Sequence, residues 1–556
     1  MKKSKRTVVY GTLPLLLGFL PLNPVQAQVE KDTTMNRTVV VENEYNPDIL
    51  DASKINALPL LEAPGTAQRS ADYATGDHVA AGGDWQSMPA LMRKWKQGQA
   101  PRGYARAGYG NKGNVDVRVG YVWDLSADDR LKIAGSWNGW NGELKSSFGG
   151  ADWDSRFYRT HVGVDYSHLF PVLKLDLGGH FASQTFNYMP FAIDNRAFQS
   201  NQTHTLGDFV VGLSSRDASL PLQFRAKAGF QHFGIKHPLN FIEEDGSQPI
   251  SLEMGDESKL FLGGDVWGQV TDEQRVGIAF QLDHLSYSDA QVANDRTSLC
   301  ANPYYQWQND HWKVRLGAHV DYVSGDFDGF DVAPDVKVEY VFADSYVFYA
   351  HALGGRELND YRSLNAKSPY WLGIVPDTYV KVNATLGLKA SPMDGLWFHL
   401  FGGYRDSQDE CFSSLASGFT VFAVDDAQNT YTGAEVKYGY KDLFDLTVKG
   451  VYSKWEGENS GNSGWLEALK PKFEFSMRAD GQVFPGLNIY GGYEYVKRTL
   501  SAIDPVSNLY VGADFEFLPR LSVFGTINNL LNKSYVYESA YPAQKLNFLA
   551  GFSYEF

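Results

Sequence analysis

The sequence predicts an all-β protein, a transmembrane antiparallel β-barrel of about 22 strands with a short extended segment before it. Three features predict this fold: an export signal, long runs of alternating apolar and polar residues, and connections that alternate between short and long. The composition agrees, because 14% of the 556 residues are aromatic and 54 are glycine. The formal net charge of −15 argues against a nucleic-acid partner, which would require a basic face.

Residues 1–27 have the pattern of a secretory signal peptide. Basic residues open the chain, residues 7–22 are uncharged and mostly apolar, and small residues precede the expected cleavage between Ala27 and Gln28. The apolar run is shorter than the ~20 residues that a spanning helix needs, and two prolines interrupt it. We therefore expect export to the outer membrane of a Gram-negative cell.

From residue 102 to residue 556 the dominant pattern has a period of two. In residues 379–389, for example, Leu386 belongs to an apolar face and Thr385 to a polar face. The polar faces repeatedly carry full charges, and many runs exceed the ~5–6 residues of an ordinary strand and reach the ~9–11 of a tilted membrane strand. These runs predict strands with one face toward lipid and the other toward a hydrated lumen.

The runs number 22, and an even number places both ends of the barrel on one side of the membrane. Tight turns alternate with long connections, and the long ones are expected outside the cell. The longest connections are residues 186–200, 236–248, 354–377 and 406–429. Strand centres are expected near residues 106, 119, 134, 160, 178, 209, 227, 263, 281, 304, 317, 338, 349, 384, 400, 436, 448, 475, 490, 512, 523 and 551.

The last strand, residues 545–556, carries alternating aromatic residues. Phe552, Tyr554 and Phe556 share one face, and we expect them to be the C-terminal signal that outer-membrane barrels present for assembly. Leu549 is the one residue of this strand that breaks the alternation.

Residues 524–556 resemble the C-terminal end of TonB-dependent outer-membrane receptors. Lys545 stands where that family often has arginine, and the matching pieces are Asn529-Leu530-Leu531-Asn532-Lys533, Tyr535, Pro542 and the final Gly-Phe-Ser-Tyr-Glu-Phe. The resemblance implies a 22-stranded barrel that acts in transport. Members of the family also carry a globular plug before the barrel, and residues 28–101 do not resemble one.

We expect residues 28–101 to lie in the periplasm or to occupy the lumen. Whether external loops fold into the lumen together with this segment, or a partner closes it, stays open. Val39, Val40 and Val41 belong to a β-branched run that faintly resembles a TonB box, the extended segment that docks on the energising protein. A short strand, or a peptide that docks on another partner, would give the same pattern.

Other candidate sites are few. Asp326, Asp328 and Asp331 form an acidic loop that could bind Ca²⁺, although the spacing is not that of an EF-hand and a solvated loop would look alike. Cys300 and Cys411 lie near external strand ends, and whether they pair stays open. The 12 histidines accompany no G-x-S-x-G or H-E-x-x-H motif, so we expect neither an enzyme nor a cofactor.

Two functions fit these predictions. The first is transport across the outer membrane by a plug-less, receptor-like barrel. The second is a non-transporting scaffold in an outer-membrane complex, such as barrel assembly or a surface lipoprotein complex. The expected partners are outer-membrane lipid, the barrel-assembly machinery and a further protein at the periplasmic or external face.

Overall fold

The computed structural model describes residues 102–556, apart from 146–151, 190–191, 194–195, 199–200, 218, 244–249, 289–292, 326–327, 344, 416–418, 442, 459–460 and 538–540. The expected signal peptide, its cleavage pair, the segment 28–101 with its valine run, and Asp326 lie outside the described residues. The barrel assigned to residues 102–556 begins at Gly103.

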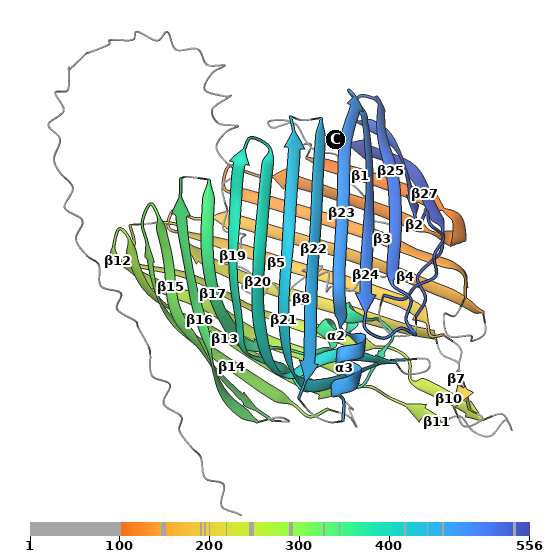
Figure 1. Cartoon of the computed structure of the whole chain (residues 1–556), viewed down its shortest axis with the longest axis horizontal. Coiled ribbons are helices and arrows are strands. Elements are labelled where there is room, and N and C mark those ends of the chain that lie inside the picture. The colour runs from red at the N-terminus through yellow and green to blue at the C-terminus, as the bar shows by residue number, and fades with distance from the viewer. Residues whose placement is uncertain are drawn as a thin grey trace, which may run out of the picture. The chain divides into compact units, whose positions relative to one another are not determined.

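The described residues form one closed antiparallel barrel, in which the first strand pairs with the last (Figure 1). Every expected strand centre falls inside an observed strand, so the prediction of 22 strands is confirmed. The barrel strands are β1 (Gly103–Gly110), β2 (Val115–Asp124), β3 (Asp129–Leu144), β4 (Trp153–Leu169), β5 (Leu173–Asn187), β8 (Asn201–Ser215), β9 (Leu222–Ile235), β12 (Asp256–Thr271), β13 (Gln274–Ser288), β14 (Arg296–Gln308), β15 (Trp312–Ser324), β16 (Gly329–Phe342), β17 (Tyr346–Glu357), β19 (Thr378–Met393), β20 (Leu396–Leu415), β21 (Thr420–Tyr440), β22 (Phe444–Gly457), β23 (Pro471–Phe484), β24 (Leu487–Arg498), β25 (Val506–Leu518), β26 (Leu521–Asn528) and β27 (Asn547–Glu555).

The shorter elements lie in the connections between barrel strands. A small separate sheet contains four of them, and β18 pairs in parallel with the start of β21. Helices α2 and α3 have seven residues each, and within the described ranges no helix is long and apolar enough to cross a membrane. These elements are η2 (Asn111–Gly113), β6 (Ala192–Ile193), β7 (Arg196–Phe198), β10 (Leu239–Glu243), β11 (Ile250–Leu252), α2 (Tyr361–Lys367), β18 (Trp371–Leu372) and α3 (Ser463–Leu469).

We call the barrel end that carries α2 and α3 the external end; the chain's C-terminus lies at the opposite, short-turn end (Figure 1). The prediction of a loop at residues 406–429 is wrong, because β20 and β21 stay paired from Leu396↔Tyr438 to Leu415↔Thr420. The polar residues that suggested a loop are accommodated in this hairpin by a bulge between Ser407 and Glu410 and by ion pairs described below.

The two faces of the strands are as the alternation predicts. Leu386 is 67% exposed on the outer surface and Phe552 is 60% exposed, whereas the hydroxyl of Thr385 lies 2.6 Å from that of Tyr431 on the inner wall. Leu549, the exception in the last strand, is buried and forms a small cluster with Phe524. It therefore faces inward with the polar row, and the two aromatic residues Phe552 and Tyr554 face outward.

Candidate functional site

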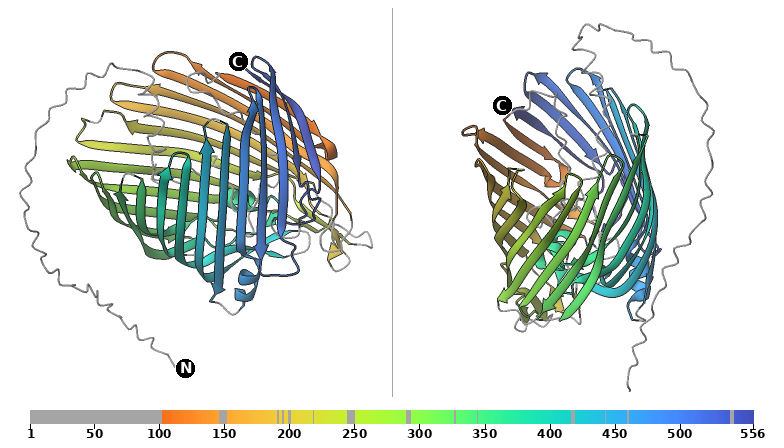
Figure 2. Two further views of the ribbon diagram at one scale, coloured as in Figure 1. Left: turned by 45° about the horizontal axis from the view of Figure 1, so that its top comes forward. Right: turned by 90° about the vertical axis from the view of Figure 1, so that its left-hand side faces the viewer.

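The connection between β17 and β19 folds into the barrel at its external end, where α2 lies between the walls (Figure 2). We call residues 358–377 the cap. Asp360 starts α2 by accepting a hydrogen bond from the backbone N–H of Ser363, at 2.8 Å. The sequence had placed this connection outside the cell as a loop, and its inward folding is the main feature that the alternation could not reveal.

A buried ion pair anchors the first turn of α2 to β12. The ammonium of Lys259 lies 2.7 Å from a carboxylate oxygen of Asp360, and these side chains are only 3% and 5% exposed. Burial alone would raise the pKa of Asp360, but the charge and hydrogen bond of Lys259, together with the backbone N–H of Ser363 and the charge of Arg296, hold the pKa below its ordinary value. Next to this pair, Glu257 accepts the backbone N–H of Tyr361 at 3.0 Å, so two strand side chains bind the helix start.

Further polar contacts hold the rest of the cap. Arg362 donates to Asp208 on β8 at 2.9 Å, and Asn365 lies 2.9 Å from the ring of His204, also on β8. At the end of the cap, Asp377 forms a buried ion pair with Arg296 at the start of β14, at 3.0 Å. The cap is therefore fixed to the wall by charged and polar groups along its whole length.

Aromatic residues fill the space between the cap and the other external connections. Tyr370 stacks on Tyr541, from the connection before β27, with ring centroids 3.7 Å apart and planes within 6°. Trp153 packs edge-on against both rings. This aromatic cluster also contains Trp140, Leu144, Phe157, Phe186, Tyr188, Met189, Phe233, Leu239, Met254, Tyr361, Leu364, Trp371, Val375, Cys411, Phe419 and Phe422.

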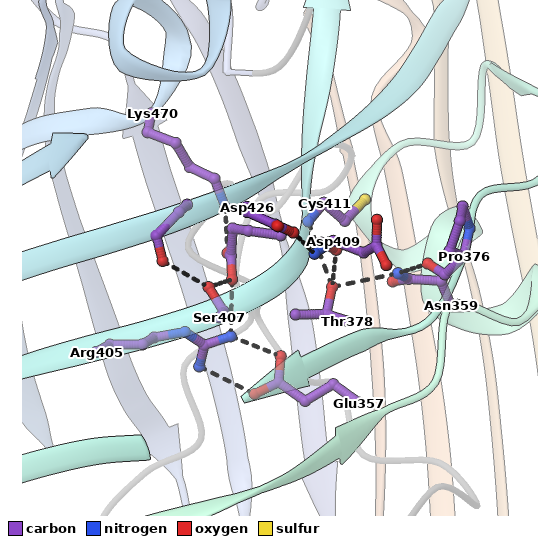
Figure 3. Close-up of polar contacts among 12 residues, drawn as sticks. Glu357, Asn359, Pro376, Thr378, Arg405, Ser407, Asp409, Cys411, Asp426 and Lys470 are labelled. Carbon is purple, nitrogen blue, oxygen red and sulfur yellow. Dashed lines mark hydrogen bonds and ion pairs between the residues drawn. The ribbon is translucent and has the colours of Figure 1, made fainter. Parts of the chain in front are cut away.

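An ion cluster joins the β17 end of the cap to the β20–β21 hairpin (Figure 3). Arg405 donates two hydrogen bonds of 3.0 Å to Glu357 and a third, of 2.9 Å, to Glu410. Ser407 donates to the same Glu410 carboxylate at 3.0 Å. Bidentate pairing of this kind fixes the orientation of both side chains, so the last residue of β17 is held against β20.

The same carboxylate also holds the connection that contains α3 (Figure 3). Lys470, at the end of α3, donates to Glu410 at 2.6 Å. Leu466 of α3 is fully buried with Phe412 and Val536 in a second apolar cluster. Glu410 thus links the connection that contains α3 to β20 and, through Arg405, to the end of β17.

Below the cap, the inner wall carries paired charges. Examples are Arg315 with Asp335 at 2.6 Å and Arg478 with Asp480 at 2.8 Å. Ion pairs on the inner wall are favourable where water fills the lumen, whereas a dry core would make so many charges costly.

The described residues of the predicted acidic loop lie apart from the cap contacts. Asp328 accepts the backbone N–H of Gly325, and Asp331 pairs with Arg356. In the ranges that the structure describes, no three His, Cys, Asp or Glu side chains are placed to hold a metal ion. Cys300 and Cys411 are free thiols, the first on β14 and the second in the aromatic cluster.

Known proteins resemble this barrel in structure but not in sequence. Neither a family model nor a curated protein matches the sequence. The FrpB iron transporter from Neisseria meningitidis matches in structure with a TM-score of 0.63 and 11% identity, over 82% of this chain and 83% of that one. The pyoverdine outer membrane receptor FpvA from Pseudomonas aeruginosa PAO1 matches with a TM-score of 0.61 and 13% identity, over 83% of this chain and 80% of that one. The copper transporter OprC matches with a TM-score of 0.59 and 12% identity, over 84% of this chain and 82% of that one.

The barrel therefore has the fold of outer-membrane receptors. Its 22 strands, its apolar outer face and its charged inner wall are those of a β-barrel of the Gram-negative outer membrane, similar in architecture to TonB-dependent receptors.

Proposed function

We propose that this chain transports a solute across the outer membrane through the barrel lumen, and that the cap is its external gate. The observation that carries the proposal is the way in which the cap is held. Charged side chains fix it to a charged wall, and opening would return both partners of these buried pairs to water, which offsets part of the lost attraction. The structural neighbours are named as transporters or receptors for iron, pyoverdine and copper, which supports the same general function.

We further propose that the barrel works without a full plug domain. Residues 28–101 provide 74 residues, and we infer that they close the periplasmic side of the lumen or dock in the periplasm through the run Val39–Val41. A 22-stranded barrel is wide enough to need such closure.

Removing the cap tests the gate. Asn359 contacts the carbonyl of Pro376 at 2.6 Å, so a short glycine linker can replace residues 361–375 without stretching the chain. We expect this variant, tested with residues 30–65 also deleted so that the other proposed closure is absent, to assemble and to admit large antibiotics that the deletion alone excludes, measured as a fall in the inhibitory concentration of vancomycin. A matched variant should replace residues 463–469, which form α3 outside the cap, and should have the smaller effect. Unchanged vancomycin sensitivity after cap removal would contradict the gate.

The scaffold function is the second candidate, and the closure itself favours it. One buried carboxylate, Glu410, holds the connection that contains α3 to the wall and pairs with Arg405, as expected of a barrel end that does not open. In that case residues 28–101 would be a periplasmic tether for a partner protein.

Deleting residues 30–65 distinguishes the two functions. The barrel should still assemble, because its strands begin at Gly103 and close on themselves. If the segment closes the lumen, the deletion should raise antibiotic permeability in a barrel whose cap is also replaced, since the native cap would still close the external end. If it is a tether, permeability should stay unchanged while a co-purifying protein is lost. A variant indistinguishable from the native protein in both assays would leave no role for the segment.

A further inference from the structure

The outer face of the barrel carries a furrow that crosses the strands from β15 to β23. It is open, has a volume of about 1110 Å³ and lies on the surface that faces lipid. Its floor combines small outward residues with the aliphatic side chains of Val338, Leu386, Leu388 and Leu400, and its two ends carry aromatic side chains. The small floor residues are Ala350, Gly402, Thr432, Ala434 and Gly450, and the aromatic ends are Trp312, Tyr340 and Phe348 on one side and Tyr452 and Phe473 on the other.

The register of the sheet explains the direction of the furrow. One row of paired residues runs from Val338 through Ala350, Leu386 and Gly402, and continues to Phe473. At ~4.8 Å between neighbouring strands, this row is about 30 Å long. Because barrel strands tilt by ~35–45°, a row perpendicular to them climbs obliquely across the membrane.

The middle of the furrow offers no free polar group. The one polar side chain of its floor, Thr432, already donates its hydroxyl to the carbonyl of Phe401 at 3.1 Å. The other polar atoms of the outward lining are the indole N–H of Trp312 and the hydroxyls of Tyr340 and Tyr452, and these lie at the two ends. The volume is that of a small-molecule site, ~300–1,000 Å³ or slightly more, and protein interfaces are much larger. A long apolar chain fits both the shape and the chemistry.

We propose that the furrow binds an acyl chain of a phospholipid from the periplasmic leaflet. Trp312 directly follows the tight turn at residues 309–311, so one end of the furrow opens at the periplasmic interface. Trp312 and Tyr340 pair there, and aromatic residues of this kind mark the headgroup level of a membrane. These two rings contact each other, with centroids 4.6 Å apart, so the acyl chain passes beside them and continues along the furrow toward Gly402 and Gly450.

Filling the furrow tests the proposal. A side chain added at Gly402 or Gly450 points outward and meets its nearest neighbour at 3.4 or 3.9 Å, so a Gly402→Leu, Gly450→Leu double variant should fold. Gly525→Leu is the matched control, because this glycine lies on the outer face of β26 with no atom within 4 Å of an added Cβ. Each protein is reconstituted in vesicles of phosphatidylethanolamine and phosphatidylglycerol, transferred to detergent and weighed by native mass spectrometry.

We expect the native protein and the control to retain one phospholipid. The double variant should retain about tenfold less, which corresponds to about 1.4 kcal/mol of binding free energy. Equal retention by all three proteins, or none by the native protein, would overturn the proposal. So would a retained second copy of the chain, or retention of lipopolysaccharide in preference to phospholipid when both are offered.

Discussion

Replacing Lys259 with methionine should release the first turn of α2 and destabilise the cap by about 3–5 kcal/mol, the usual cost of removing one partner of a buried ion pair. The substitution leaves the carboxylate of Asp360 in a site that is almost closed to water, without the ammonium that now lies 2.7 Å away. Hydrogen–deuterium exchange of residues 358–377 measures the effect directly. We expect exchange in the cap to accelerate while the barrel strands remain protected, because their own hydrogen bonds are unaffected.

The double variant Lys259→Met, Asp360→Asn is the control for this prediction. The asparagine can still accept the N–H of Ser363 and start the helix, but it carries no charge that needs a partner. We therefore expect the double variant to regain much of the protection that the single variant loses. If the cap exchanges equally fast in the single and the double variant, then the unpaired charge of Asp360 is not what destabilises the cap in the single variant.

Most of the barrel could be predicted because the alternation of side chains along a strand depends only on neighbouring residues. A strand shows its two faces at successive residues, so Leu386 and Thr385 were assigned to opposite faces from the sequence alone. The same rule located all 22 strands of the barrel. Leu549 follows the alternation and faces inward, and it can be apolar there because it packs against Phe524 of the neighbouring strand, a contact that an alternating pattern does not record.

The cap could not be predicted, because its contacts join residues far apart in the chain. Lys259 is recognisable as a charge on an inner face, but nothing local indicates that Asp360, 101 residues later, is its partner. A signal was nevertheless present. Tyr361, Tyr370 and Trp371 make this connection too aromatic for a solvated external loop, and all three are buried in the structure.

Replacing Leu386 with arginine should impair assembly of the barrel. Leu386 lies near the middle of β19, so a charged side chain there enters the centre of the lipid layer. An arginine at that depth on the lipid face costs about 2–4 kcal/mol. Urea-driven unfolding of the protein in lipid vesicles should show the loss as a lower midpoint, and the folded fraction in cells should fall.

Thr385→Arg is the matched comparison, since the two residues are neighbours at nearly the same depth. The side chain of Thr385 points to the inner wall, where its hydroxyl contacts that of Tyr431 and where charged residues are common. An arginine on this face can remain hydrated, so we expect the loss of one hydrogen bond and a cost of about 1 kcal/mol. Leu386→Ala separates lost packing from added charge and should resemble Thr385→Arg more than Leu386→Arg. Equal effects of the two arginines would mean that residue 386 does not face lipid, and the membrane orientation of the whole sheet would then be wrong.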